Sequence, residues 1–189
     1  MSKPRPRPSL PSDPRPDRRR RAWAVATLVA PSLAWLAVAP SPAQALERPT
    51  GPVVLTLRGR LRRPNLGADA QFDMAMLEAL PQSSFVTRTP WYAQARRFTG
   101  PLLRDVLDAA GADGQQLRLL ALNDYRVDMP VDDAMRHDVV VARLVDGRAM
   151  SVRDKGPLFV IYPFDANAEL RTATYYNRSA WQLRTIEVI

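Results

Sequence analysis

The sequence predicts a single α+β domain with a mixed, mostly β-sheet core and two or three short helices. Segments with strand-like alternation or continuous apolar character outnumber segments with helical spacing. The two clearest helical patterns, over 70–80 and 101–110, both lie in the first half of residues 46–189. After residue 116, β-type segments follow one another with turn residues between them. Strands and helices segregated in this way favour α+β over an alternating α/β fold.

The first 45 residues have the layout of a secretory signal peptide. A Pro/Arg-rich start and the arginines at 18–21 precede an apolar run over 22–39, which leads to Ala43-Gln44-Ala45. A basic region, an apolar core and an A-x-A site predict cleavage after Ala45 and a periplasmic or secreted product. A retained membrane anchor is the alternative, but prolines interrupt the run, and a span needs about 20 apolar residues. Export by the Sec or the twin-arginine route stays open.

The predicted mature domain, residues 46–189, is close to electrically neutral. The whole chain has 27 basic and 19 acidic residues, and residues 1–45 hold eight of the basic and two of the acidic ones. Residues 46–189 therefore hold 19 basic and 17 acidic residues. This small excess of positive charge does not indicate nucleic-acid binding, which requires a concentrated basic face. No membrane contact is expected after cleavage of the signal peptide.

The chain contains no cysteine and one histidine, His137. Disulfides are therefore excluded, and packing alone must stabilise an exported domain. The chain has no thiolate for a metal ion or a substrate, and one histidine excludes a multi-histidine metal site. We predict no protein-ligated metal, and we expect His137 to be exposed and non-catalytic.

Each element has a local justification. In the first half of residues 46–189 we predict a strand over 53–61, a loop over 62–70 and a helix over 70–80 that is stopped by Pro81. A strand over 83–89 and a helix over 101–110, capped by Gly111, follow. In the second half we predict strands over 117–123 and 125–130 around a turn at Asn123-Asp124, one helical turn over 131–136, a hairpin over 139–152 turning at Asp146-Gly147, a strand buried on both faces over 157–163, and a terminal strand over 181–189.

Five motifs in order resemble a known family. A loop with Trp91 leads into FTGPLLRDVL, followed by LNDYRVDMPVDD, DGRAMSVRDKGPL and a terminal WQLRTIEV. This order is similar to the molybdopterin-binding domain of the sulfite oxidase family, in particular its short, exported, stand-alone bacterial members. The resemblance runs from about Val53 to Ile189. It implies a mixed α+β fold and molybdopterin as the cofactor.

The chain departs from the family pattern where catalysis is concerned. In catalytic members a cysteine thiolate ligates molybdenum just before the aromatic residue, and here positions 87–89 are Thr-Arg-Thr. Neither residue type replaces a soft thiolate ligand. The segment Gly156-Pro157-Leu158-Phe159 lacks an arginine common in the family, and Ala180 stands where a lysine is common. The resemblance therefore implies a binding domain without cysteine-ligated molybdenum. Whether the chain is an enzyme stays open, and the sequence identifies no catalytic residue.

The stretch VTRTPWYAQARRFTGPLL, residues 86–103, supplies the first candidates for binding. Arg88, Arg96 and Arg97 could hold an oxyanion through bidentate bonds; the alternative is a solvated loop. Trp91 and Tyr92 could stack on a flat ring system, or they could cover the core.

Further candidates come from segments that border the pocket in the resembling family. A turn fully explains Asn123 and Asp124, and Tyr125 could pack in the sheet. The charges at 153–155 are explained by a charged turn before the buried strand. Tyr162, at the end of the buried strand, and residues 175–178, in the loop predicted after it, could complete a polar-aromatic cleft or cap the sheet. The predicted cofactor-binding residues are Arg88, Trp91, Asn123, Asp124, Arg153, Lys155 and Tyr162.

Three functions remain as hypotheses at this stage. The first is an exported, non-catalytic binder of a pterin or other anionic ligand. The second is an active molybdenum oxidoreductase whose metal is held only by the cofactor's dithiolene and by oxygen ligands. The third is a periplasmic interaction domain that takes a protein partner. The binding hypothesis predicts that Arg88, Trp91, Asn123, Lys155 and Tyr162 lie on one concave face.

Overall fold

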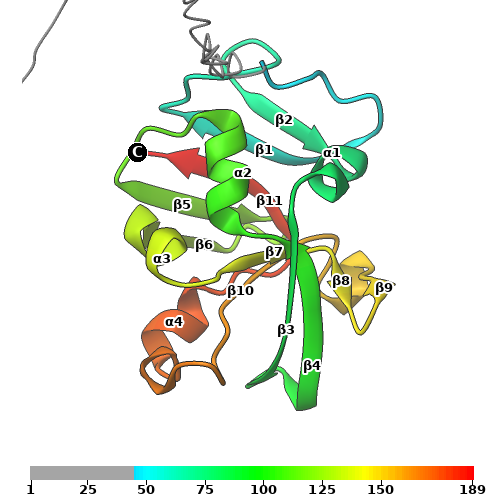
Figure 1. Cartoon of the computed structure of the whole chain (residues 1–189), viewed down its shortest axis with the longest axis vertical. Coiled ribbons are helices and arrows are strands. Elements are labelled where there is room, and N and C mark those ends of the chain that lie inside the picture. Colours follow the sequence, from blue (N-terminus) through cyan, green and yellow to red (C-terminus); the bar gives the residue numbers. More distant parts are fainter. Residues whose placement is uncertain (1–44) are drawn as a thin grey trace, which may run out of the picture. The chain divides into compact units, whose positions relative to one another are not determined.

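The computed structural model describes residues 45–189 (Figure 1). The predicted signal peptide lies outside the described residues except for Ala45, so its cleavage and its lack of packing against the domain remain predictions. Within 45–189, no helix has both the length and the apolar character needed to cross a membrane.

A five-stranded mixed sheet forms one half of the core, in the order β2-β1-β11-β5-β6. Its strands are β1 (Val53–Gly59), β2 (Ala70–Asp73), β5 (Gln116–Ala121), β6 (Arg126–Pro130) and β11 (Leu183–Val188). Only the central pair β1–β11 is parallel; the other three pairs are antiparallel. Alternation places Leu57, Ile186 and Leu119 in register across the sheet, and all three are fully buried. The predicted mixed sheet is confirmed.

Helix α2 (Leu103–Ala110) covers the core with one apolar stripe. Leu103, Val106 and Ala110 are fully buried in the same cluster as the inner side chains of the five-stranded sheet. The predicted cap at Gly111 is confirmed: its φ of 63° is left-handed, and its N–H bonds back to the carbonyls of the last turn. Pro101 ends the preceding strand rather than starting the helix.

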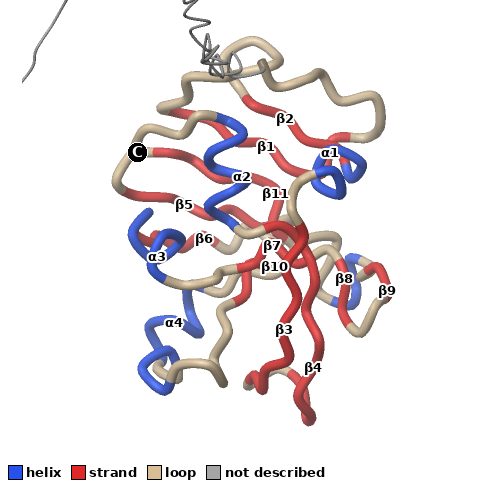
Figure 2. The backbone as a smooth tube through the Cα atoms, viewed as in Figure 1, coloured by secondary structure: helices blue, strands red, loops and turns tan. Residues whose placement is uncertain are grey.

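A four-stranded antiparallel sheet, β3-β4-β8-β9, extends from this core (Figure 2). Strands β3 (Gln82–Thr89) and β4 (Tyr92–Pro101) form a long hairpin that turns at Pro90-Trp91. Most of the stretch 86–103 is therefore hairpin rather than loop. The short strands β8 (Leu144–Val145) and β9 (Arg148–Ala149) join at Asp146-Gly147, whose positive φ values of 50° and 76° confirm the predicted turn.

Strand β10 (Phe159–Ile161) lies between two partners. It pairs with β7 (Val140–Ala142), and the Val160 N–H donates to the Ala180 carbonyl at 2.9 Å on the other side. All three of its residues are fully buried. The predicted interior strand is confirmed, and it links the two larger sheets.

Two segments differ from the prediction. The pattern over 70–80 is a strand followed by a short helix, α1 (Met74–Ala79), because Phe72 belongs to the sheet and Asp73 caps the helix. The Asp73 carboxylate accepts from the N–H groups of Met76 at 2.9 Å and Gly51 at 2.7 Å. These bonds hold the pKa of Asp73 below its ordinary value.

The second difference is in residues 175–178, which we expect from the sequence to lie in a loop and which belong to a helix, α4 (Ala173–Arg178). Helix α3 (Val131–Arg136) and the 3₁₀ helices η1 (Val152–Asp154) and η2 (Ala168–Leu170) complete the described elements. The described part of the domain thus has four short α-helices, more than the two or three expected.

Replacing Ile186 by alanine should lower the free energy of unfolding by about 2–5 kcal/mol, because β11 is central and its fully buried side chain would leave a cavity. Urea denaturation would measure the loss. Ile186→Val is the matched control and should cost about 0.5–1.5 kcal/mol. Equal midpoints for the wild type and Ile186→Ala would contradict the central place of β11.

Candidate functional site: an aromatic cavity beside an arginine

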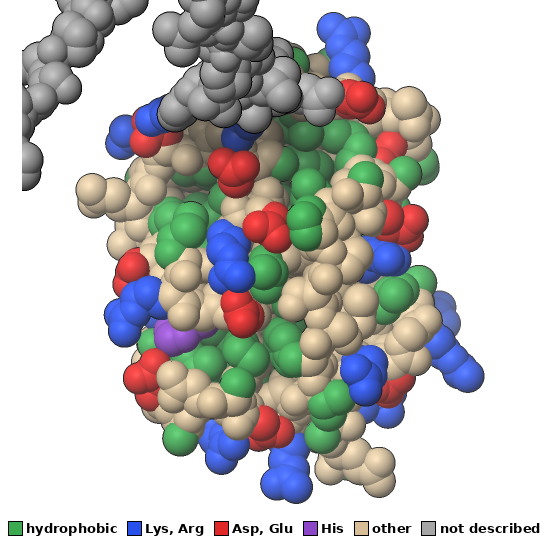
Figure 3. Space-filling model, viewed as in Figure 1, with side chains coloured by type: hydrophobic (Ala, Val, Ile, Leu, Met, Phe, Trp, Pro, Cys, Tyr) green, Lys and Arg blue, Asp and Glu red, His purple; other side chains and the backbone are tan. Residues whose placement is uncertain are grey.

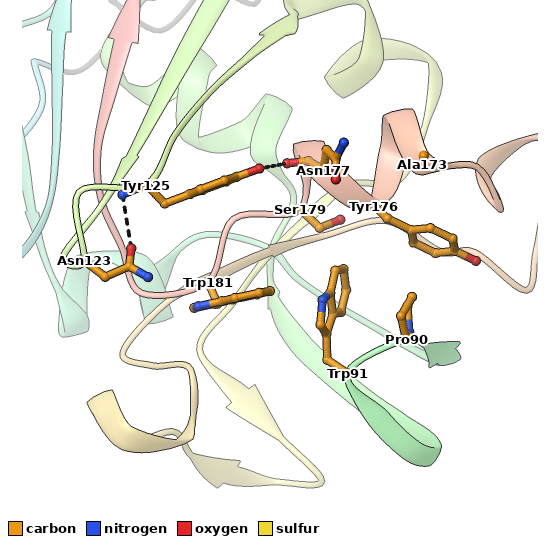
Figure 4. Close-up of a pocket in the computed structure, with 9 residues that line it drawn as sticks. All are labelled: Pro90, Trp91, Asn123, Tyr125, Ala173, Tyr176, Asn177, Ser179 and Trp181. Carbon is orange, nitrogen blue, oxygen red and sulfur yellow. Dashed lines mark hydrogen bonds between the residues drawn. The ribbon is translucent and has the colours of Figure 1, made fainter.

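A cavity of about 430 Å³ opens where four segments meet: the β3–β4 turn, the β5–β6 turn, α4, and the chain just before β11 (Figure 4). Its volume falls in the range of about 300–1,000 Å³ typical of small-molecule sites. Its lining combines aromatic rings with amide and hydroxyl groups and includes no charged side chain. The lining residues are Pro90, Trp91, Asn123, Tyr125, Ala173, Tyr176, Asn177, Ser179 and Trp181.

Trp91 is the best-anchored wall of this aromatic cavity. Its ring centroid lies 5.5 Å from that of Trp181 and 5.5 Å from that of Phe159, both edge-on. The Tyr176 ring stands perpendicular to it, with centroids 6.2 Å apart. Aromatic pairs in such geometries contribute about 0.5–1.5 kcal/mol each beyond burial. The indole is therefore held in one orientation by contacts with the core.

Tyr125 points from the β5–β6 turn toward Asn177 of α4 (Figure 4). Its hydroxyl donates to the carbonyl oxygen of Asn177 at 2.8 Å, which connects the β5–β6 turn to α4. The turn itself is set by the Asn123 side chain, whose oxygen accepts from the Tyr125 N–H at 3.2 Å, and by the positive φ of 62° at Asp124. Asn123 thus shapes the turn and also borders the cavity.

A second cavity, of about 310 Å³, adjoins the first and shares Pro90 and Tyr176 with it. Its lining carries two arginines, Arg88 and Arg171. Arg171 is engaged: it pairs with Asp165 at 3.1 Å and donates to the Phe164 carbonyl at 2.9 Å. Among the ion pairs of residues 45–189, none involves the Arg88 guanidinium. Arg88 is thus the cation most available to a ligand here.

Thr87 has a structural task. It is fully buried, and its hydroxyl accepts from the Asp165 N–H at 3.0 Å, while the Asp165 carboxylate accepts from the Arg88 N–H at 2.8 Å. This reciprocal pair locks the end of β3 to the loop after β10. Of the three positions where the resembling enzymes carry the thiolate, Thr87 serves this lock, and Arg88 and Thr89 line the second cavity.

Positive charge also lies against the aromatic rings near the first cavity. The Lys155 ammonium is 5.5 Å from the Trp181 ring and 5.4 Å from the Tyr92 ring, and the Arg96 guanidinium is 5.3 Å from the Tyr92 ring. Burial raises the pKa of Tyr92 above its ordinary value, although Arg96 acts in the opposite direction. Lys155 has a left-handed φ of 74°, which ends η1 and turns the chain toward Gly156.

The structure brings part of the predicted set together. Trp91 and Asn123 line the aromatic cavity, and Arg88 lines the adjoining one. Lys155 lies next to this group through its contact with Trp181. Three of the five residues expected on one concave face therefore line one or other of two neighbouring cavities, and a fourth, Lys155, lies beside a lining residue.

The other predicted residues lie elsewhere. The expectation that Tyr162 lies on the concave face is wrong: it is fully buried at the end of β10. Asp124 is mostly exposed and lies 3.5 Å from Arg184, and Arg153 is exposed on η1. Neither lines the two cavities. His137 is half-buried rather than exposed, with part of its ring visible in Figure 3 and its centroid 5.7 Å from that of Tyr175.

Sequence reasoning missed Trp181 and Ser179, and it weighed Tyr176 and Asn177 without including them in the predicted set. The sequence pattern predicts Trp181 only as the start of the terminal strand. A signal was present, because Trp181 lies two residues before the buried Leu183, and same-face alternation would have continued the apolar surface toward the hairpin.

The fold and the cavities define an α+β domain with a ligand-sized, aromatic and amide-lined site. Residues 68–168 match the model of the oxidoreductase molybdopterin binding domain. This match covers more than half of the chain, which therefore belongs to that family, the molybdopterin-binding domain of the sulfite oxidase family. No curated protein gave a significant match.

The cofactor implied by this family suits the site only in part. A flat ring system matches the shape and chemistry of the aromatic cavity, and an anionic group matches Arg88 in the adjoining one. The chain has no cysteine, and Thr87 is committed to Asp165, so the residues present do not supply the family's thiolate ligand.

Thr87→Val should reduce the free energy of unfolding by about 1–3 kcal/mol, because a nearly isosteric side chain would leave the Asp165 N–H without its acceptor. Thr87→Ser keeps the oxygen and should retain more of the stability. Chemical denaturation of both variants checks this. If the valine variant proves as stable as the wild type, Thr87 does not lock the hairpin.

Proposed function

We propose that this chain is an exported, non-catalytic member of the molybdopterin-binding family that binds a pterin or another flat, anionic ligand. The observation that carries the proposal is the aromatic cavity of about 430 Å³, which shares the lining residues Pro90 and Tyr176 with the cavity lined by Arg88. A ligand with a ring at one end and a negative group at the other suits this pair.

The ring would enter the aromatic cavity. The planes of the Trp91 and Trp181 rings meet at 74°, so the two rings form adjacent walls of the cavity rather than a stack. Asn123 and Asn177 line the same cavity, and amides both donate and accept, as the edge of a pterin does. The absence of charged side chains from the lining favours a neutral heterocycle at this end.

The anionic group would lie beside Arg88. Its guanidinium can offer parallel N–H donors to a phosphate or carboxylate. Asp165 belongs to the same cavity and would repel an anion, but its charge is offset by Arg171 at 3.1 Å. Lys155, close to Trp181, adds positive charge near the first cavity.

The residues around β3 support a role without turnover. The family's metal-ligating position has no thiolate here, and the threonine at 87 is buried in a structural contact. Family membership favours a second candidate, an active oxidoreductase whose metal is held without any protein sulfur. That candidate requires substrate-dependent electron transfer by the cofactor-loaded protein, and a redox assay that detects none would remove it.

Export is part of the proposal because of the basic, apolar and A-x-A layout of residues 1–45. Protein recovered from the periplasm or medium should begin at Leu46, as read from its intact mass. Replacing Ala43 and Ala45 by glutamine should block processing, because the peptidase site requires small residues. A secreted product that retains Met1 would contradict the predicted cleavage.

Calorimetric titration can separate the two ends of the proposed ligand. 6-Hydroxymethylpterin tests the ring, and its monophosphate tests the ring with the anion. Arg88→Ala should weaken binding of the monophosphate by about 1.5–3 kcal/mol, the range for a hydrogen bond to a charged group, and leave binding of the uncharged pterin nearly unchanged. The melting temperature should change little, because Arg88 is exposed.

Arg97→Ala is the matched control. Arg97 is an exposed arginine of the same hairpin, but it lines neither cavity, so its removal should affect neither titration. Equal losses for the two arginine variants would indicate a general charge effect and no anion subsite at Arg88. If wild-type protein binds neither pterin, the ring assignment fails.

A further inference from the structure

A buried polar cluster lies outside both cavities and joins three elements. Its centre is Asp133 of α3, which is 6% exposed. One oxygen of its carboxylate, Oδ2, accepts from the Tyr162 hydroxyl at 2.7 Å and from Nη1 of Arg178 at 2.8 Å. Tyr162 follows β10 in the core, and Arg178 is the last residue of α4. Asp133 therefore connects α4 to the centre of the domain.

The chemistry of this cluster makes it strong and specific. Arg178 is permanently charged, and its side chain is 23% exposed, so the ion pair with Asp133 is screened only weakly by water. Burial, and then the bond to Asp133, raise the pKa of Tyr162 far above its ordinary value. Tyr162 thus stays protonated and remains a donor.

Helix α4 has few means of its own to hold a position. It has six residues, no side-chain bond at its N-cap and no fully buried residue. Helices this short are not stable in isolation. Its Tyr175 and Tyr176 rings pack against Tyr162 and Phe164, with centroids 5.2 and 4.7 Å apart. The ion pair to Asp133 fixes its end.

The same helix forms a wall of the aromatic cavity. Tyr176 and Asn177 line that cavity, and they immediately precede Arg178. We propose that Asp133 is a positioning residue for the aromatic cavity: by holding Arg178, it keeps α4 in place, with its three lining residues, Ala173, Tyr176 and Asn177, facing the cavity. This inference goes beyond the proposed function because it does not depend on which ligand enters.

A purely structural role for Asp133 makes a different prediction. In that case loss of either donor would weaken the core and leave the cavity unchanged. Tyr162→Phe removes the donor on the core side, and Arg178→Met removes the donor on the α4 side. Because both donors bind the same oxygen, the two variants form a matched pair that separates stability from cavity shape.

Tryptophan fluorescence can report on the cavity alone. The chain has four tryptophans, and Trp91 and Trp181 are the two that line it. In the full chain with Trp23→Phe and Trp35→Phe, all tryptophan emission comes from the cavity walls. We would measure quenching by acrylamide, whose access rises when α4 moves away, and we would follow unfolding of the same samples by circular dichroism.

Arg178→Met should raise the quenching constant about twofold or more, because local release of α4 exposes the indoles. Tyr162→Phe should lower the melting temperature and leave quenching at the level of the parent. Arg178→Lys keeps a cation and should restore part of the protection. Similar quenching in the Tyr162→Phe and Arg178→Met proteins, raised or not, would overturn the inference.

Arg178→Gln guards against failure of the methionine variant to fold, because it retains a donor and is the milder change. If Arg178→Met does not fold, Arg178→Gln must show the rise in quenching, and unchanged quenching in it would equally overturn the inference. No ligand is used in any arm, so failure of the pterin titrations would leave this result standing, and the reverse also holds.

Discussion

The packing of Trp91 against Phe159 and Trp181 is the contact on which the rest of the site depends. Trp91 lies in the turn of a long hairpin, Phe159 in the buried strand β10, and Trp181 just before the central strand β11. The centroid of the Trp91 ring lies 5.5 Å from that of Phe159 and 5.5 Å from that of Trp181, although the three segments are far apart in the chain. This contact fixes the tip of the hairpin against the core and creates one side of the aromatic cavity.

The remaining walls are held by polar contacts of a different kind. The Tyr125 hydroxyl donates to the Asn177 carbonyl, and Arg178, at the end of α4, donates to the Asp133 carboxylate. The hydrogen bond between Thr87 and Asp165 holds the end of β3 to the loop after β10. The ring contacts of Trp91 and these three polar contacts together maintain the cavity. None of these contacts requires a thiolate, because at position 87 it is a threonine hydroxyl that accepts from the Asp165 N–H.

Strong local signals in the sequence predicted their elements correctly. Gly111 and Asp146-Gly147 adopt the left-handed conformations that their positions require, and the continuous apolar run around Val160 forms a buried strand. The prediction of one helix over 70–80 is wrong because the spacing of Phe72, Met76 and Leu80 also suits a strand followed by a short helix. There the sheet pairing of β2 with β1 decided the outcome, together with the Asp73 cap.

The site was predictable only in part because tertiary contacts assemble it. The family order placed Trp91 and Asn123 near one pocket, and the structure agrees. The prediction for Tyr162 is wrong because a tyrosine at a strand end can face either the core or a cleft, and its buried partner Asp133 is distant in sequence. Asp124 was included with its neighbour, but the turn directs it toward Arg184 and the solvent.

The central claim is that the domain keeps its family's binding cavity without the metal chemistry. Native mass spectrometry of protein purified from the cell that makes it tests this claim most directly. The account predicts mature protein carrying an organic ligand of pterin-like mass, without the isotope pattern of molybdenum. Stoichiometric molybdenum on the purified protein would contradict it.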